Sequence, residues 1–464
     1  MDSIAVTRHG KVRGQLQDGI RVFRGIPYAA PPFGAERFRA PAPVRPWEGV
    51  RDALEFGPTA PKRPYRPPLD RLIPEERIPG DDCLNLNVWT PAVDDGARPV
   101  MVWIHGGSLR NGSSSVPLYD GHAFARDGVV LVSINYRLGV EGFGVFPDAP
   151  DNRGLLDQIA ALEWVRDNIA AFGGDPGNVT VFGESAGAIC IGALLTHPRA
   201  QGLFRRAIMQ SGPPATAARE EAAKIVKLMA AELGVPATAG AFAAVDRERL
   251  LDAQAEVVGK ADPITGGPGF HLVAEPGTGR VEADLLIGAN REEYRLWFVP
   301  TGAVDRVSRL TLRLALLKFR IPGRVARLYR SSRPGAKPGE ILGEIATDLL
   351  MRGPLNRLAD SVERAYVYEF AWRSPVMGLG SCHGLEIGFV FDNLRHCREL
   401  AGDDAPQDLA DAMHRAWIAF AATGDPGWQR WDSSRPVMVF DSPGSGVVHA
   451  PRDEELRVWL DRAR

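Results

Sequence analysis

The clearest chemical signature in the chain is a serine placed between two glycines. Gly183, Ser185 and Gly187 fit the pattern G-x-S-x-G, between the β-branched run NVTVF and a segment of helical composition. On such a strand-to-helix turn the hydroxyl stands exposed at a helix N-terminus, where free N–H groups favour developing negative charge. The pattern indicates a nucleophilic serine, although a glycine-rich turn with an incidental serine would read the same.

A serine nucleophile needs a base to take its proton and an acid to orient that base. In hydrolases with this turn the chain order is serine, acid, histidine, so both partners should lie downstream. Of the nine histidines, His383 is favoured, because a Gly-Ser-Cys turn precedes it and a strand-like run, AYVYEFAW, comes before that turn. His396 and His414 lie in charged, helix-like segments and are predicted to be surface residues.

Two adjacent carboxylates are candidates for the acid. Glu292 and Glu293 follow the strand-like run ADLLIGAN, and the residues alone do not choose between them. The chemistry also needs N–H donors where the carbonyl oxygen becomes negative. The turn at 105–108, His-Gly-Gly-Ser, follows the run PVMVWI and can point N–H groups inward, and Ala186 should add a donor. A plain Gly-Gly turn without any role in binding the oxyanion would have the same residues.

The segments that must position these residues alternate between strands and helices. Continuous apolar runs, typical of strands buried on both faces, are LNLNVWT, PVMVWI, GVVLVSI and NVTVF. Before the last of them, residues 155–169 repeat apolar side chains at helical spacing. Such repeats predict a mostly parallel sheet with right-handed crossovers. Near the N-terminus, GKVRGQL and GIRVFRGI predict an antiparallel hairpin.

The remaining segments carry weaker signals. Residues 57–80 are rich in proline and charge and predict an exposed loop, residues 215–260 predict helices, and residues 260–280 predict another loop. The last 60 residues predict a helix over DLADAMHRAWIAFAATG and a strand-like tail. Because no repeat or dividing linker interrupts the chain, we expect a single domain over 1–464.

Composition limits the partners and the compartment. The chain has 464 residues, 45% hydrophobic and 24% charged, with a net charge of −2, so nucleic acid and membrane partners are not expected. No apolar stretch reaches the roughly 18 residues of a membrane helix, and the N-terminus lacks a secretory signal pattern. Four dispersed cysteines without a CxxC pair indicate reduced thiols, neither disulfides nor a metal site, and a cytoplasmic location.

These motifs resemble those of the type-B carboxylesterases, which include the cholinesterases and bacterial para-nitrobenzyl esterases. Segments similar to the family's occur in family order along nearly the whole chain; among them are FRGIPYAAPPFGAERFRAP, DDCLNLNVWTP, INYRLGVEGF, IGANREE and CHGLEIGFVF. The resemblance implies an α/β-hydrolase fold: a large, mostly parallel sheet flanked by helices, with antiparallel strands at its N-terminal end. It also implies a serine carboxylic-ester hydrolase that acts on small to medium acyl or aryl esters through an acyl-enzyme, without metal or cofactor.

The resemblance further assigns roles. It makes Ser185 the nucleophile, His383 the general base and then acid, and Glu293, the second of the Glu-Glu pair, the triad acid. The implied oxyanion donors are Gly107, Ser108 and Ala186. Two structural ion pairs are implied as well, Arg37 with Asp81 and Arg137 with Asp175.

The chain departs from the family pattern at several positions. Tyr294 stands where the family has glycine, which would narrow the gorge or shift the loop that aims Glu293, and Leu109 replaces a phenylalanine, which would open the pocket wall. Cys83 matches a family half-cystine but has no partner in the preceding loop, as expected in the cytoplasm. That loop has Tyr65 as its only aromatic residue and no tryptophan, which argues against choline esters.

Three alternatives stay open at this point. The same triad would serve an amidase, a carbamate hydrolase, a thioesterase or a lipase. A catalytically inactive binding protein of the same fold is the second. The third is an intact triad left misaligned by Tyr294 and by a shortened stretch before residue 281. The physiological ester and the oligomeric state are not given by these residues.

Overall fold

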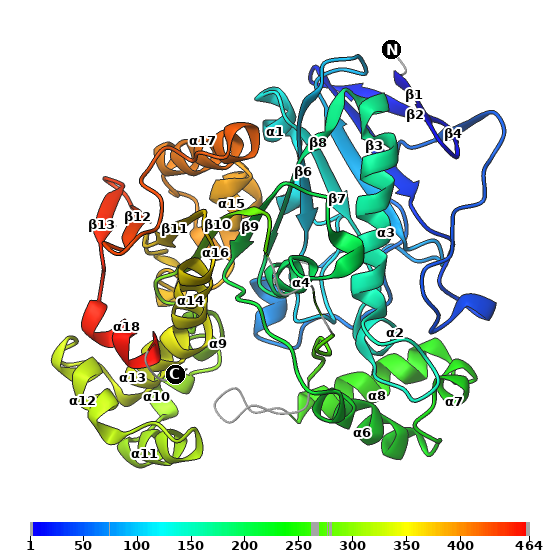
Figure 1. The fold of residues 1–464 in the computed structure, drawn as a ribbon. Helices are drawn as coiled ribbons and strands as arrows, with labels where there is room; N and C mark the ends of the chain where they lie inside the picture. Colours follow the sequence, from blue (N-terminus) through cyan, green and yellow to red (C-terminus); the bar gives the residue numbers. More distant parts are fainter. Residues whose placement is uncertain (1–2, 74, 261–268, 276, 278–280, 461–464) are drawn as a thin grey trace.

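A computed structural model describes residues 3–73, 75–260, 269–275, 277 and 281–460 (Figure 1). Within these residues 13 strands form one sheet, in the order β1-β2-β3-β5-β7-β6-β8-β9-β10-β11-β12-β13, with β4 paired to β2. The strands are β1 (Ser3–Thr7), β2 (Gly10–Gln17), β3 (Ile20–Pro27), β4 (Val50–Asp52), β5 (Asn85–Thr90), β6 (Arg98–Ile104), β7 (Val130–Ile134), β8 (Gly174–Glu184), β9 (Arg206–Gln210), β10 (Asp284–Asn290), β11 (Ala365–Phe370), β12 (Pro436–Phe440) and β13 (Gly446–His449).

The sheet is parallel from β7 through β12. Toward both ends it is antiparallel, except that β4 pairs parallel with β2. The predicted N-terminal hairpin is confirmed, since β2 and β3 pair antiparallel. The continuous apolar run of β5 predicted a parallel strand. Instead, β5 is antiparallel to both β3 and β7. The connection over 91–97 is too short for the crossover that parallel strands need, so β5 and β6 run in opposite directions.

The helices are α1 (His122–Arg126), α2 (Gly139–Phe143), α3 (Arg153–Asn168), α4 (Ala186–Leu194), α5 (Arg219–Ala222), α6 (Lys224–Leu233), α7 (Ala239–Ala243), α8 (Arg247–Gly259), α9 (Arg295–Phe298), α10 (Ala303–Arg306), α11 (Arg309–Lys318), α12 (Gly323–Ser331), α13 (Pro338–Thr347), α14 (Gly353–Ser361), α15 (Ile387–Val390), α16 (Arg398–Ala401), α17 (Gln407–Thr423) and α18 (Asp453–Leu460). Among the residues described, no helix combines the length and apolar character that crossing a membrane requires.

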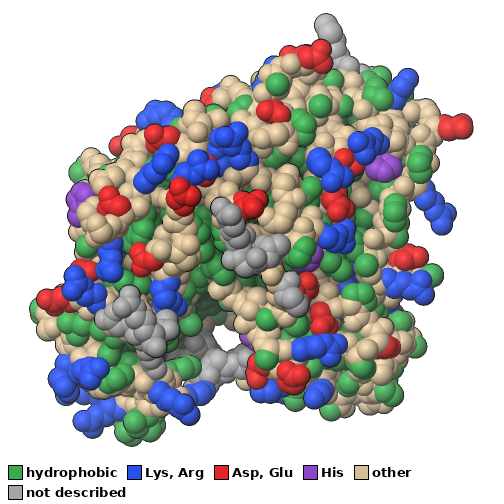
Figure 2. Space-filling view, in the orientation of Figure 1, with side chains coloured by type: hydrophobic (Ala, Val, Ile, Leu, Met, Phe, Trp, Pro, Cys, Tyr) green, Lys and Arg blue, Asp and Glu red, His purple; other side chains and the backbone are tan. Residues whose placement is uncertain are grey.

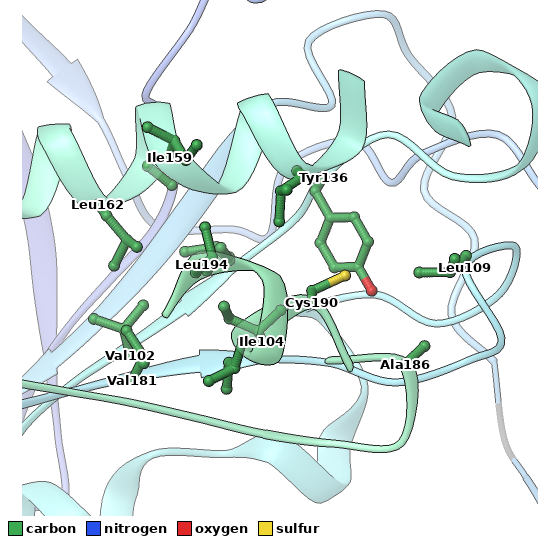
Figure 3. Close-up of a cluster of buried hydrophobic side chains, with 14 of the residues drawn as sticks. Val102, Ile104, Leu109, Tyr136, Ile159, Leu162, Val181, Ala186, Cys190 and Leu194 are labelled. Carbon is green, nitrogen blue, oxygen red and sulfur yellow. The ribbon is translucent and has the colours of Figure 1, made fainter. Parts of the chain in front are cut away.

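Alternate side chains of the central strands point to two separate hydrophobic cores. In β6, Val102 and Ile104 face the core that holds α3, α4 and α14, whereas Met101 and Trp103 face the core that holds α1, α15 and α17. Figure 3 shows the first core, where side chains of α3 and α4 meet those of β6 and β8. A strand covered on both faces must be apolar at every position, which explains the continuous runs in the sequence.

Most of the secondary-structure predictions that fall on described residues are confirmed. Helix α3 covers the predicted periodic segment, helices α5 to α8 occupy 215–260, and 57–80 is irregular apart from a short 3₁₀ turn. Much of the predicted loop over 260–280 lies outside the described residues. The C-terminal tail forms β12 and β13 as expected, but its last described residues form helix α18, which was not predicted.

Both implied scaffold ion pairs are wrong. Arg37 pairs with Glu141 at 2.6 Å, and Asp81 instead pairs with Arg247 at 2.8 Å. Glu141 on α2 lies beside Arg37, so it takes the place that the family resemblance gave to Asp81.

Arg137 is buried against α3 and not against the β8 segment. It pairs with Asp157 at 2.6 Å, with both side chains no more than 1% exposed. Asp175 instead accepts a hydrogen bond from the backbone N–H of Gly177 at 2.8 Å, which stabilises its own turn. A buried guanidinium needs a buried carboxylate close by, and the nearest one comes from the helix that covers the sheet.

Candidate active site

Ser185 occupies a strained turn between the end of β8 and the start of α4. Its backbone has φ 53° and ψ −120°, a conformation that residues with a side chain rarely adopt. A Cβ on Gly187 would lie 2.0 Å from the carbonyl oxygen of Ile104, and a Cβ on Gly183 would lie 2.6 Å from the same atom. The two glycines are therefore required because the turn passes directly against β6.

The structure brings His383 and Glu293 together. Nδ1 of His383 lies 2.6 Å from Oε2 of Glu293, and the two side chains are buried at 5% and 1% exposure. The other carboxylate oxygen of Glu293 accepts a hydrogen bond from the N–H of Asn290 at 2.7 Å. This contact fixes the carboxylate toward the imidazole.

Glu292 faces a different set of partners. Its carboxylate lies 2.6 Å from the guanidinium of Arg373 and accepts the N–H of Ser381 at 3.2 Å. Of the two candidate acids, only Glu293 contacts the imidazole in the described structure.

The second imidazole nitrogen faces a carboxylate and not the serine. Nε2 of His383 lies 2.9 Å from Oε1 of Glu184, at ion-pair distance. Within the described residues, no hydrogen bond joins the Ser185 hydroxyl to the imidazole, although both side chains line the same cavity. Catalytic hydrogen bonds are often loose without substrate and tighten when it binds.

The electrostatics of the cavity favour the imidazolium. Burial by itself would lower the pKa of His383, but the charges of Glu184 and Glu293 raise that pKa well above its usual value. An imidazole held between two carboxylates is therefore a stronger base than a free histidine.

The Gly-Gly turn presents free N–H groups near the serine. A Cβ on Gly106 would lie 3.2 Å from Cβ of Ser185, so the two segments touch. Gly107 has φ +111° and Ser108 has φ 55°. In the described part of the chain, the N–H groups of Gly107, Ser108 and Ala186 have no hydrogen-bond acceptor.

The cavity around these residues is mainly apolar and aromatic. It is lined by apolar side chains from the loop over 57–80, from 116–119 and from α9, α15 and α16; these include Leu69, Leu72, Ile73, Val116, Leu118, Leu296, Ile387 and Leu400. Tyr65, Tyr119 and Trp297 supply aromatic surface, and the Trp297 ring lies 4.8 Å from the His383 ring. Among the described residues, no group of three acidic, histidine or cysteine side chains could hold a metal ion.

Comparison with known proteins identifies the family. The model of the carboxylesterase family matches residues 1–459. The chain belongs to the carboxylesterase family. It is 38% identical over 480 residues to the para-nitrobenzyl esterase of Bacillus subtilis, covering 95% of each chain. It is 38% identical over 494 residues to the phenmedipham hydrolase of Pseudarthrobacter oxydans, covering 99% of this chain and 97% of the relative.

The fold of this carboxylesterase family member is that of the solved family structures. A PNB esterase structure superposes with a TM-score of 0.87 at 35% identity, covering 99% of each chain. The implied α/β-hydrolase fold is therefore confirmed, and the protein is a carboxylic-ester hydrolase. Membership of this family and this enzyme class rules against the alternative of a catalytically inactive binding protein.

Three predictions about individual side chains of the esterase are wrong. Tyr294 does not line the active-site cavity; its ring packs into the helices α9 to α13, where a Cβ on Gly343 would touch it at 2.1 Å. Leu109 does not open the cavity wall, since it is buried in the core that Figure 3 shows and does not line the cavity. His414 is buried, and its Nδ1 lies 2.7 Å from the carbonyl oxygen of Val390, whereas His396 is exposed as predicted and borders the cavity.

The structure also brings in residues of the esterase that the sequence analysis did not select. Glu184 contacts the His383 imidazole, and its position directly before the serine was the available signal. Asn290 links Glu386 to Glu293, because its side-chain amide donates to Glu386 at 2.6 Å and its backbone N–H donates to Glu293 at 2.7 Å. Burial among carboxylates raises the pKa of Glu386 to about 8. Trp297 comes from a helix that no pattern predicted.

Proposed function

We propose that this protein hydrolyses small to medium acyl or aryl esters through an acyl-enzyme on Ser185. His383 acts as the base and Glu293 orients it. The observation that carries the proposal is the contact of 2.6 Å between His383 and Glu293 beside a serine held on a strained turn in the same cavity.

In the first half of the reaction, the imidazole turns its Nε2 from Glu184 to the Ser185 hydroxyl and takes its proton. The serine oxygen attacks the ester carbonyl. The oxyanion then accepts hydrogen bonds from the free N–H groups of Gly107, Ser108 and Ala186. His383 returns the proton to the leaving alcohol, and the acyl group stays on the serine.

In the second half, water replaces the alcohol. His383 takes a proton from water, the hydroxide attacks the acyl-enzyme, and the same three N–H groups hold the second oxyanion. The acid leaves and Ser185 recovers its proton. This scheme uses only side chains and backbone groups of the chain, without metal or cofactor.

We propose neutral aryl or acyl esters as the substrate class. The names of the two curated relatives, para-nitrobenzyl esterase and phenmedipham hydrolase, favour aromatic substrates. The apolar lining and the rings of Tyr65, Tyr119 and Trp297 support that class, because aromatic groups bury large surfaces against one another. Glu75 and Glu184 also line the cavity and would repel a negatively charged acyl group.

We further propose a single domain over 1–464 and a cytoplasmic location. One continuous sheet through the described residues supports the first. The cytoplasmic location is supported by the cysteines, all of which are buried free thiols: Cys83, Cys190, Cys382 and Cys397.

The direct test is the variant Ser185→Ala assayed with para-nitrophenyl butyrate, with Ser331→Ala on α12 as the matched control. We expect turnover to fall by about 1000-fold or more in Ser185→Ala and to stay unchanged in Ser331→Ala. A fluorophosphonate probe should label the wild type and the control but not Ser185→Ala. Full activity of Ser185→Ala would contradict the proposal.

A further inference from the structure

The helices α11 and α12 carry a strong local excess of positive charge. Residues 306–335 contain no aspartate or glutamate. Their basic residues are Arg306, Arg309, Arg313, Lys318, Arg320, Arg324, Arg327, Arg330 and Arg333. The net charge of −2 for the whole chain conceals this cluster. All but Arg333 are exposed, and Figure 2 shows blue side chains gathered at the lower left, where Figure 1 places α11 and α12.

The outward face of α11 is apolar. Leu310, Leu314 and Leu317 are 64%, 57% and 72% exposed, although leucine is usually buried. Their spacing of four and three residues puts them on one face of the helix. The opposite face, formed by Leu312, Ala315 and Leu316, is buried in the cluster of α9 to α13. The exposed leucines are therefore additional to those that hold α11 in place.

Basic side chains border the apolar stripe on both sides. At 3.6 residues per turn, Arg313 lies on one flank of the stripe and Lys318 on the other. Phe319, directly after the helix, is 42% exposed and extends the apolar surface. The acidic residue just before the segment, Asp305, pairs with Lys337 at 2.6 Å and so does not offset the cluster.

We infer that α11 docks on an anionic lipid surface, with its leucines in the acyl region and its basic residues among the headgroups. An apolar helix face bordered by arginine and lysine is the pattern that binds membrane interfaces. A second copy of the chain is a poorer occupant, because a two-fold contact would place one positive cluster against the other. This docking is independent of the proposed esterase chemistry.

The test uses the full-length protein and sedimentation with vesicles of phosphatidylcholine alone or mixed with phosphatidylglycerol. We expect binding only to the mixed vesicles and a loss of binding in high salt, because exposed charges are screened. Binding to both vesicle types alike, or to neither, would overturn the inference.

Two variants separate the charge from the apolar contribution. Arg309→Gln with Arg313→Gln should weaken binding by on the order of 25-fold, since one basic residue near an anionic surface is worth about fivefold. Leu317→Ser should weaken it by about tenfold. The matched controls are Arg39→Gln with Arg45→Gln, and Leu228→Ser on α6, which is 47% exposed. Equal weakening by the controls would contradict the inference.

Two further readouts separate lipid binding from misfolding and from self-association. Every variant should keep wild-type hydrolysis of soluble para-nitrophenyl butyrate, which shows that it is folded. Light scattering should give the same mass for the wild type and Leu317→Ser. A dimer that dissociates in Leu317→Ser would overturn the inference and assign this face to a second copy of the chain.

Discussion

Glu292 and Glu293 are neighbours in the chain, but their side chains meet different partners. Glu293 contacts the His383 imidazole, whereas Glu292 pairs with Arg373. We therefore expect Glu293→Gln to lower turnover by on the order of 100-fold or more, since an amide cannot stabilise the imidazolium. Glu292→Gln should cause a much smaller loss. Steady-state kinetics with para-nitrophenyl butyrate compares them, and the reverse ranking would overturn the assignment.

Glu184 makes a second prediction at the residue scale. Its carboxylate is a main cause of the raised pKa of His383, and in the proposed mechanism only the neutral imidazole accepts the serine proton. In the wild type, activity should fall as the pH drops through that raised pKa. Glu184→Gln removes a negative charge, so the acidic limb of the kcat/KM profile should move to lower pH. A limb at the wild-type position would contradict this account.

At the scale of elements, the turn between β8 and α4 depends on close backbone contact. The methyl group of Gly187→Ala would lie 2.0 Å from the Ile104 carbonyl oxygen and 2.9 Å from that of His105. Backbone atoms inside a sheet cannot move aside easily, so we expect a loss of about 1–3 kcal/mol in stability. Because Ser185 would be displaced, the Gly187→Ala variant should also lose most of its esterase activity.

The matched control for this turn is Gly323→Ala on α12, where a Cβ meets nothing within 4 Å. Its urea midpoint should equal or exceed that of the wild type. If Gly187→Ala is as stable and as active as Gly323→Ala, the turn does not require the close approach described here.

At the scale of the whole molecule, Glu369 on β11 ties the C-terminal segment to the sheet. Burial by itself would raise its pKa, but Arg452, Arg352 and Arg291 lower it from 4.5 to about 2. A carboxylate with a lowered folded-state pKa stabilises the protein above pH 4.5, and this stabilisation is lost as the pH falls toward 2. The shift corresponds to about 3 kcal/mol at neutral pH.

Glu369→Gln should therefore be about 3 kcal/mol less stable than the wild type at pH 7 in urea unfolding. The difference between the two should shrink between pH 4.5 and pH 2, where the wild type loses the stabilising charge. The control Glu454→Gln, an exposed position nearby, should unfold as the wild type does at both pH values. A constant difference across this pH range would rule out the charge as the cause.

Much of this protein was predictable from the sequence because the relevant features are local. The G-x-S-x-G turn lies within one strand-turn-helix segment, so its glycines and serine carry their own geometry. Continuous apolar runs predicted the central strands, since a strand covered on both faces needs apolar residues throughout. The family resemblance then chose Glu293 over Glu292 as the expected acid.

Tertiary structure alone decided which side chains meet across the fold. It placed Glu184 at the imidazole, turned Tyr294 away from the cavity, buried His414 and paired Arg137 with Asp157. It also left the leucines of α11 exposed, although their spacing would suit a buried face equally well. These outcomes depend on contacts between segments distant in the chain. A local sequence pattern therefore does not determine which partner a side chain contacts in the folded protein.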